Sequence, residues 1–300
     1  MKGLALGLSA TAALALAGTA GHHRPAVVQV GAQPTGLAAG AGSLWSANSA
    51  GGTVSRISPT RSKVIATIKV GSGPSSVAYG DGSVWVGDFT ANALYRIDPA
   101  TNQVVTTIPL HGPCTGIVVA QDASVWVAEY SAGTVARLDP ATNAVVDRVP
   151  VGGKAEALAF TEGRLWVTNG AGYVSAVDPE TGKVTAKVKV GRDVDAVAAS
   201  SRGLWVTTYN SGIVARIDPA KAKVVERLRL PGNASGVTFA RRSLWVSDAG
   251  FGQVDRIDPA RARIVKRYAV GLTPRDLVTV GRGLWVVEQG SNDVRRIPLP

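Results

Sequence analysis

The hexapeptide GLWVTT at residues 203–208 decides the fold, because six variants of it recur along the chain. They are SLWSAN at 43–48, SVWVGD at 83–88, SVWVAE at 124–129, RLWVTN at 164–169, SLWVSD at 243–248 and GLWVVE at 283–288. The seven tryptophans follow one another at intervals of 40, 41, 40, 39, 40 and 40 residues. A fixed period near 40 residues indicates one supersecondary unit copied along the chain.

One repeat unit divides into short, Val- and Ile-rich segments that alternate with period two. In the unit around Trp205 these segments are 194–199, 203–208, 213–217 and 223–230, separated by Ser-Arg-Gly, Asn-Ser-Gly and Asp-Pro-Ala-Lys turns. No window keeps the 3.6-residue period of a helix. We therefore predict an all-β protein, a seven-bladed β-propeller with four antiparallel strands per blade.

The two ends of the repeat array complement each other. Residues 26–30 (AVVQV) have the pattern of a fourth strand that lacks its first three, and residues 293–299 (DVRRIPL) have that of a third strand that lacks its fourth. We expect the N-terminal strand to complete the last blade, which closes the ring and removes the free sheet edges of an open array.

The N-terminus has the features of a secretory signal peptide. Met1 and Lys2 precede an apolar run of small residues that ends in Gly18-Thr19-Ala20. We expect cleavage after Ala20, which leaves 21–300 as a single propeller domain, secreted or periplasmic and not transmembrane. The alternative is an uncleaved membrane anchor, since the run is just long enough to span. The single cysteine, Cys114, allows no internal disulfide, so stability must come from packing and ring closure.

The repeat phrases resemble a known family. Residues 165–169 (LWVTN), 172–174 (GYV) and 177–179 (VDP) are similar to the YVTN-type β-propeller repeat, with Trp in place of its first Tyr. The chain also resembles the streptogramin B (virginiamycin B) lyase group, seven-bladed propellers that open a cyclic peptide lactone with Mg²⁺. That group carries histidines in the loops that lead into late blades, where this chain has Ser235 and Arg275. Glu288 is similar to the group's acid, so the resemblance assigns it acid–base work.

Strand direction predicts two rings of side chains at one mouth of the central channel. The residue three after each Trp should lie there: Asn48, Asp88, Glu129, Asn169, Thr208, Asp248 and Glu288. The loop that leads into each blade, called here the leading loop, supplies the second ring: Thr35, Ser75, Thr115, Glu156, Asp195, Ser235 and Arg275. The expected ligand-binding residues are Asn48, Asp88, Glu129, Glu156, Asn169, Asp195, Asp248, Arg275 and Glu288.

The acidic character of these rings limits the classes of ligand that we expect. An acidic concave mouth suits a cationic or polyhydroxy ligand, or a hard cation such as Mg²⁺ or Ca²⁺ bound by oxygen. The alternative is a solvated loop face on which strand-end Asp and Asn side chains cap turns.

A second, weaker catalytic hypothesis involves His111, the only histidine inside the repeats, in the stretch His-Gly-Pro-Cys-Thr at 111–115. A thiolate nucleophile needs a base within hydrogen-bond reach, so His111 and Cys114 form a candidate pair. The alternative is an ordinary loop histidine beside a small buried cysteine. Glycine-rich phosphate loops, zinc-ligand spacings and Gly-x-Ser-x-Gly elbows do not occur.

The positive charge is concentrated in the second part of the chain. From Lys183 onward there are 21 Lys and Arg against 10 Asp and Glu, a net charge of +11, whereas the part before it has 11 of each. Much of this excess falls on predicted outer strands, where charge discourages edge-to-edge aggregation. A patch for an anionic envelope polymer is the alternative. We expect no nucleic-acid partner, because the chain has the features of an exported protein.

These patterns support two hypotheses about function. The first is an exported, non-enzymatic binding or scaffold propeller that presents an acidic channel mouth to a small molecule or a partner protein. The alternative is a metal-assisted lyase or lactone hydrolase resembling streptogramin B lyase. The absent pair of late-blade histidines favours binding.

Overall fold

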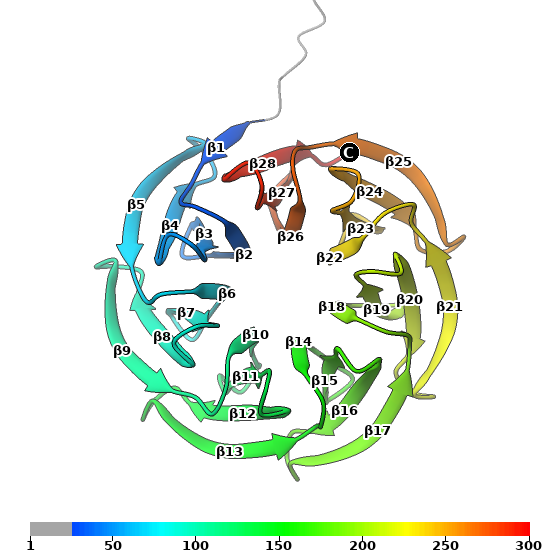
Figure 1. The fold of residues 1–300 in the computed structure, drawn as a ribbon, viewed down its shortest axis with the longest axis horizontal. Helices are drawn as coiled ribbons and strands as arrows, with labels where there is room; N and C mark the ends of the chain where they lie inside the picture. The colour runs from blue at the N-terminus through cyan, green and yellow to red at the C-terminus, as the bar shows by residue number, and fades with distance from the viewer. Residues whose placement is uncertain (1–25) are drawn as a thin grey trace, which may run out of the picture.

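The structure, a computed structural model, describes residues 26–300. Seven four-stranded antiparallel sheets are arranged in a ring, with β2, β6, β10, β14, β18, β22 and β26 nearest the centre (Figure 1). The predicted seven-bladed β-propeller is confirmed. The predicted signal peptide lies outside the described residues.

The strands of each blade run from the channel outward. Blades one to three comprise β2 (Pro34–Gly40), β3 (Ser43–Asn48), β4 (Thr53–Ser58), β5 (Lys63–Lys69); β6 (Pro74–Gly80), β7 (Ser83–Asp88), β8 (Ala93–Asp98), β9 (Gln103–Pro109); and β10 (Cys114–Val119), β11 (Val125–Glu129), β12 (Thr134–Asp139), β13 (Ala144–Pro150). Blades four and five comprise β14 (Ala155–Thr161), β15 (Arg164–Asn169), β16 (Tyr173–Asp178), β17 (Lys183–Lys189); and β18 (Val194–Ser200), β19 (Gly203–Thr208), β20 (Ile213–Asp218), β21 (Lys223–Arg229). Blades six and seven comprise β22 (Ala234–Ala240), β23 (Ser243–Asp248), β24 (Gln253–Asp258), β25 (Arg263–Ala269); and β26 (Pro274–Val280), β27 (Gly283–Glu288), β28 (Asp293–Pro298), β1 (Val27–Gln29).

The ring closes through the pairing of β1 with β28, as the sequence predicts. Val28 lies opposite Val294 in this antiparallel pair. Both side chains are buried in a cluster with Leu44 of blade one and Trp285 of blade seven. The closing strand therefore contributes to the core between the last blade and the first.

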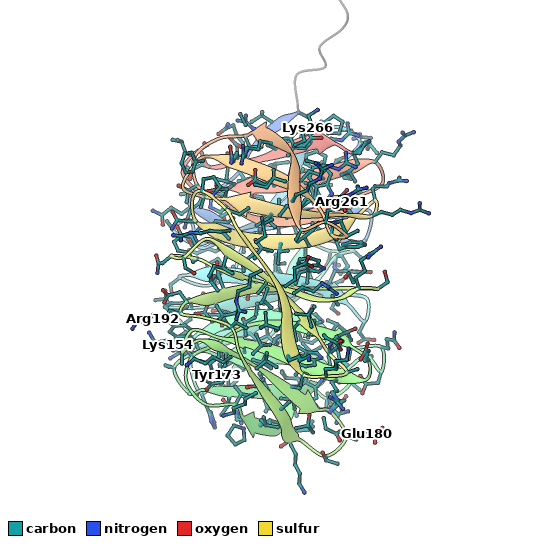
Figure 2. All side chains as sticks on the ribbon, turned by 90° about the vertical axis from the view of Figure 1, so that its right-hand side faces the viewer. Lys154, Tyr173, Glu180, Arg192, Arg261 and Lys266 are labelled. Atoms are coloured by element: carbon teal, nitrogen blue, oxygen red, sulfur yellow. The ribbon has the colours of Figure 1, made fainter. Side chains whose placement is uncertain are left out.

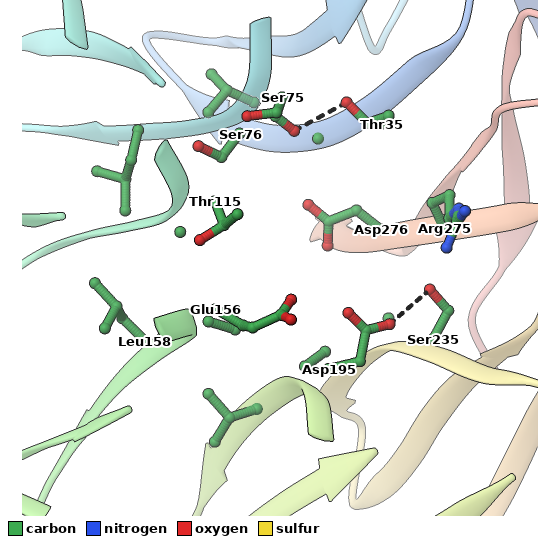
Figure 3. A pocket seen from close by; sticks show the side chains of 18 of the residues that line it. Thr35, Ser75, Ser76, Thr115, Glu156, Leu158, Asp195, Ser235, Arg275 and Asp276 are labelled. Carbon is green, nitrogen blue, oxygen red and sulfur yellow. Dashed lines mark hydrogen bonds between the residues drawn. The ribbon is translucent and has the colours of Figure 1, made fainter. Parts of the chain in front are cut away.

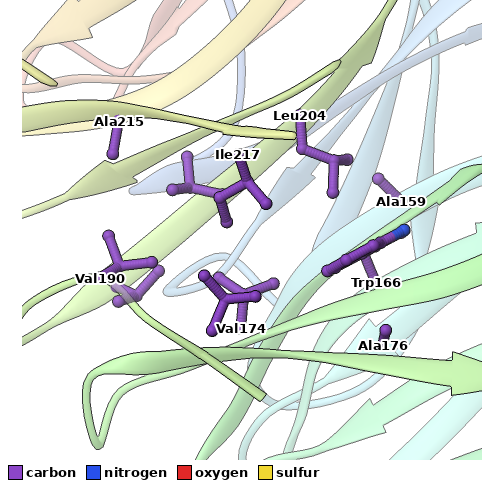
Figure 4. Close-up of a cluster of buried hydrophobic side chains, with 11 residues drawn as sticks. Ala159, Trp166, Val174, Ala176, Val190, Leu204, Ala215 and Ile217 are labelled. Atoms are coloured by element: carbon purple, nitrogen blue, oxygen red, sulfur yellow. The ribbon is translucent and has the colours of Figure 1, made fainter. Parts of the chain in front are cut away.

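The tryptophans pack between neighbouring blades. All seven indole rings are at most 1% exposed. Trp166 of blade four, for example, packs with Leu204 and Ile217 of blade five (Figure 4). A large ring at one position per blade fills the wedge between twisted sheets, which explains the constancy of the repeat.

An arginine clasp links successive blades, a contact that the repeat pattern does not predict. The Arg96 guanidinium lies 4.9 Å from the ring centroid of Trp85 in its own blade. It also donates hydrogen bonds to the Pro140 carbonyl (2.6 Å) and to Asn143 Oδ1 (2.8 Å) in the β12–β13 turn of the next blade. Arg56 repeats this pattern between blades one and two. The Asp-Pro turns thus provide carbonyl acceptors for the preceding blade.

Candidate ligand-binding site at the channel mouth

β-Bulges position the side chains that face the channel. At the start of the first strand of every blade the register of the sheet shifts, so that one or two residues have no partner on the second strand. The bulged residues include Glu156 in blade four, Asp195 in blade five and Arg275 with Asp276 in blade seven. A bulge re-aims side chains away from the regular pleat. The leading-loop ring that the sequence predicts is therefore a ring of bulge residues.

This ring lines a cavity of about 380 Å³ at the channel mouth. All seven predicted leading-loop residues contribute to its wall: Thr35, Ser75, Thr115, Glu156, Asp195, Ser235 and Arg275. Figure 3 shows the carboxyl groups of Glu156, Asp195 and Asp276 pointing into it. Asp276 is absent from the sequence-based set because it is the second residue of its bulge, one position beyond the ring.

The strand-end ring does not line the mouth, which corrects the expectation for six predicted ligand-binding residues. Their side chains are 0% exposed: Asn48, Asp88, Glu129, Asn169, Asp248 and Glu288. They lie beneath the leading loops, which pass over the ends of the second strands. The period of the repeat identifies the end of the sheet on which these residues lie but not their depth below its surface.

Several of these buried side chains cap backbone N–H groups instead. Asp88 accepts hydrogen bonds from the N–H groups of Gly73 (3.0 Å), Thr90 (2.8 Å) and Ala91 (2.7 Å). Asp248 accepts hydrogen bonds from those of Gly232 and Asn233. These bonds stabilise buried carboxylates and fix the leading loops. The alternative is therefore right about capping, but the ring is buried rather than a solvated loop face.

Glu288 is an exception among the strand-end residues. Neither of its carboxyl oxygens has a hydrogen-bond partner within residues 26–300, and Arg295 Nε lies 3.9 Å from Oε1. Burial raises the pKa of Glu288 to about 8. Because its side chain is sealed from the channel, Glu288 is not placed to act on a ligand in the mouth, although the family resemblance assigns it that role.

The carboxyl groups in the cavity have raised pKa values. Burial, together with the neighbouring Asp195, raises the pKa of Glu156 to about 7, while Lys154 acts in the opposite direction. Burial also raises the pKa of Asp195, against the lowering effect of Arg275. Asp276 has its pKa raised to about 6 by burial, although its oxygens accept hydrogen bonds from the N–H groups of Leu37 (2.9 Å) and Leu277 (2.8 Å). A cation placed among these groups would relieve both repulsion and desolvation.

Aromatic and cationic side chains form the rim above blades three to five. A second hollow, continuous with the first through Glu156, Asp195 and Arg275, is also lined by Tyr130 and Tyr209. Lys154 Nζ lies 5.3 Å from the Tyr130 ring centroid. Arg275 donates a hydrogen bond to Gln289 Oε1 (3.0 Å), so its charge is partly engaged. The rim can therefore stack against a ligand whose charged end reaches Glu156.

His111 and Cys114 do not form a catalytic pair among the described residues. Cys114 is fully buried and its thiol contacts Ser76 Oγ at 3.6 Å. Burial raises the pKa of this thiol to about 12. His111 donates a hydrogen bond from its backbone N–H to Glu129 Oε1 (2.8 Å). The residue itself is exposed and lies in a loop. A buried thiol with a raised pKa is a poor nucleophile.

The next question is whether the side chains of residues 26–300 could hold a metal ion. No group of three or more His, Cys, Asp or Glu side chains in this range is arranged to hold a metal ion. Two of the oxygens of Asp276 already accept backbone hydrogen bonds. The described residues therefore do not fit a Mg²⁺ or Ca²⁺ ion held by protein carboxylates alone.

Residues 26–300 contain no apolar helix of the length that a membrane span requires.

Comparisons with known proteins agree on the fold. The glutamine cyclotransferase family pattern matches residues 114–235, less than half of the chain, and this segment contains Glu156 and Asp195. No curated protein matches the chain in sequence.

Solved structures cover nearly the whole chain. Virginiamycin B lyase from Staphylococcus aureus is similar with a TM-score of 0.81 and 15% identity, over 92% of this chain and 99% of that one. A streptogramin B lyase structure has a TM-score of 0.80 and 14% identity, over 92% and 97%. Kuenenia stuttgartiensis hydrazine synthase has a TM-score of 0.79 and 17% identity, over 89% and 95%. The resemblance to the streptogramin B lyase group is confirmed at the level of fold.

Proposed function

We propose that this chain is an exported binding propeller that takes a small ligand bearing a primary ammonium group into the acidic channel mouth. The observation that carries the proposal is the juxtaposition of Glu156 with Asp195 on the cavity wall. Asp195 accepts one side-chain hydrogen bond, from Ser235 Oγ (3.3 Å), and Asp276 is occupied by backbone N–H groups. Of these three cavity carboxyls, Glu156 therefore gains the most from a cationic ligand.

The cavity suits a small molecule rather than a protein segment. Its volume of about 380 Å³ lies at the lower end of the range for ligand pockets. An ammonium group would donate to Glu156 and Asp195, and the flanking rings of Tyr130 and Tyr209 would contact the apolar part of the ligand. The Lys154 and Arg275 cations at the rim would disfavour a second positive charge there.

The test is thermal unfolding of the protein with n-butylamine and with benzylamine, monoamines that carry an apolar group, with acetate and glucose as anionic and neutral controls. A ligand that binds only the folded state raises the midpoint. We expect a rise with the amines that increases from pH 6 to pH 8, since the pKa of Glu156 is about 7. The Glu156→Gln and Asp195→Asn variants should lose it.

Glu180→Gln is the matched control, because Glu180 is exposed in the β16–β17 turn, away from the cavity lining. An equal rise in this control and in Glu156→Gln would contradict the proposal, as would the absence of any rise with either amine.

A second candidate function is acid–base catalysis at the same site, either intramolecular acyl transfer or the opening of a cyclic lactone. A carboxyl with a pKa of about 7 is suited to exchange a proton near neutral pH. The glutamine cyclotransferase match covers both Glu156 and Asp195, and the streptogramin B lyase group shares the fold. Here Glu156 would act as the general acid or base. Turnover of N-terminal glutaminyl peptides, or of cyclic depsipeptides supplied with Mg²⁺, that is lost in Glu156→Gln would favour this function over binding alone.

A further inference from the structure

The outer wall of blades four to six carries a one-sided array of positive charge. The outermost strands β17, β21 and β25 follow one another around one side of the ring (Figure 1). Their basic residues, called here the basic belt, are all exposed: Lys183, Lys187, Lys189, Lys223, Arg227, Arg229, Arg263, Lys266 and Arg267. Figure 2 views the molecule from this side and labels Lys266.

Few acids neutralise the basic belt. Glu226 is the one acidic residue on these three strands, and it is engaged by Arg216 at 2.9 Å. In the adjoining turns, Asp218 pairs with Lys221 (3.1 Å) and Asp258 pairs with Arg261 (3.0 Å). The charges of the belt are therefore largely uncompensated by the chain itself.

Five belt residues have no side-chain hydrogen bond, ion pair or cation–π contact within residues 26–300: Lys183, Lys189, Lys223, Arg229 and Arg263. The other four have partial engagements, such as Arg267 with Asp255 at 3.6 Å and Lys266 over the Tyr268 ring at 4.7 Å. Long cationic side chains that stabilise nothing in their own molecule are free to contact another one.

The other blades show that this charge is unnecessary for the fold. β9 of blade two has no charged residue, and β13 of blade three has one acid and one base, Asp147 and Arg148. Both strands pair with their neighbours in the same register as β17 and β21. Protection of the outermost edge would apply to every blade, so it does not explain why the charge gathers on three adjacent ones.

We propose that the basic belt is a docking surface for a flexible, linear polyanion, an acidic or phosphate-bearing polymer without nucleobases. Alternate residues on a strand project to the same side about 7 Å apart. Repeating anions along a flexible chain can engage such a row and continue onto the next blade. Neighbouring outer strands turn by one seventh of a circle, because seven blades complete the ring.

This curvature disfavours the other anionic partners. A flat bilayer that contacts β21 cannot also contact β17 and β25, because the wall of the ring curves away from it on both sides. Duplex DNA is too stiff to bend around a wall of this size. Single-stranded nucleic acids bind through exposed aromatic platforms. The one aromatic residue on the three strands, Tyr268, is partly buried against Trp245, with ring centroids 5.4 Å apart.

The test compares two triple variants with equal loss of charge. The belt variant is Lys189→Gln, Arg229→Gln and Arg263→Gln. The control variant is Arg61→Gln, Lys63→Gln and Lys69→Gln, whose residues are equally exposed on and beside β5 of blade one. Equal thermal midpoints would establish that both fold. Binding of long-chain polyphosphate and of dextran sulfate is measured by titration, with neutral dextran, tripolyphosphate, duplex DNA and phosphatidylglycerol vesicles as comparisons.

We expect both long polyanions to bind the unaltered protein and the control variant, and the belt variant to bind them roughly tenfold or more weakly at about 50 mM salt. Tripolyphosphate should bind far more weakly than long-chain polyphosphate, because it cannot span several strands. Equal weakening in both variants, tighter binding of DNA or vesicles than of the polymers, or no binding of the polymers would overturn the proposal.

Discussion

The guanidinium of Arg275 lies 4.9 Å from the ring centroid of Tyr209. Arg275 belongs to the bulge that opens blade seven, and Tyr209 follows β19 in blade five. The contact therefore joins blades seven and five, and it holds a cation at the edge of an otherwise acidic cavity. This cation lowers the pKa of Asp195.

Replacing Arg275 should consequently change the pH range over which an ammonium ligand binds. Without the nearby positive charge, the pKa of Asp195 should rise, and Arg275→Gln should shift the midpoint of n-butylamine binding to higher pH. Calorimetric titrations between pH 5 and 8.5 would measure the shift. The control is Arg192→Gln, an exposed residue of the leading loop of blade five. An unchanged midpoint in Arg275→Gln would contradict the assigned role.

The stability of the ring should fall as pH rises, because of Glu288. Its pKa is about 8 in the folded chain and near 4.5 in the unfolded chain. Between these values the folded state binds the proton more tightly, so the stability it contributes is present below about pH 4.5 and is lost as pH rises to about 8.

Glu288→Gln should therefore be more stable than the unaltered protein at pH 8, by about 1 kcal/mol or more, and show little gain at pH 4.5. Urea unfolding at the two pH values measures the difference. Glu180→Gln serves as the exposed control and should show no such dependence. A gain of equal size at both pH values would indicate a packing effect rather than titration.

The arginine clasp should contribute measurably to stability. Arg96→Ala removes the contact with Trp85 together with two hydrogen bonds to the next blade. We expect it to lower the free energy of unfolding by about 1–3 kcal/mol. Arg61→Ala, at an exposed turn position, should change it by less than about 0.5 kcal/mol. Similar values for the two variants in urea titrations would show that the clasp contributes nothing beyond a surface arginine.

Ring closure can be tested with two adjacent residues of β1. Val28 is 4% exposed and Val27 is 43% exposed. Val28→Asp places a carboxylate in the core between blades seven and one, and should cost about 3 kcal/mol or more. Val27→Asp should be nearly neutral. Thermal unfolding and limited proteolysis of the two variants provide the measurement, and a comparable loss in both would mean that β1 is not part of a cooperative ring.

Nearly all of the fold and about half of the candidate site are predictable from the sequence. The period of the tryptophans, together with the complementary ends at 26–30 and 293–299, was sufficient for blade number, strand order and closure. Period-two alternation predicts which residues share a face, but it assumes an unbroken pleat. The bulges break it, and for this reason Asp276 was missed.

The depth of a side chain below the protein surface is the second property that the repeat does not predict. Asp88 and Glu156 lie at the same end of their sheets, yet one is sealed under a loop while the other lines the cavity. A glycine in the leading loop offers a signal for this difference. At Gly71 a Cβ atom would collide with a carboxylate oxygen of Asp88, which indicates that the loop backbone rests directly on the strand-end acid.

The pairing of β1 with β28 has a consequence for the order in which the protein is made. Among the strands that the structure describes, β1 leaves the ribosome first and its partner β28 leaves last. Blades one to six can each pair their strands as the chain grows, but β1 has no partner until Asp293–Pro298 has been synthesised. A product that stops short of β28 would expose unpaired strand edges at both ends of its array, the kind of surface that chaperones and proteases recognise. Closure of the ring therefore depends on translation through Asp293–Pro298, because β1 pairs with no other strand in residues 26–300.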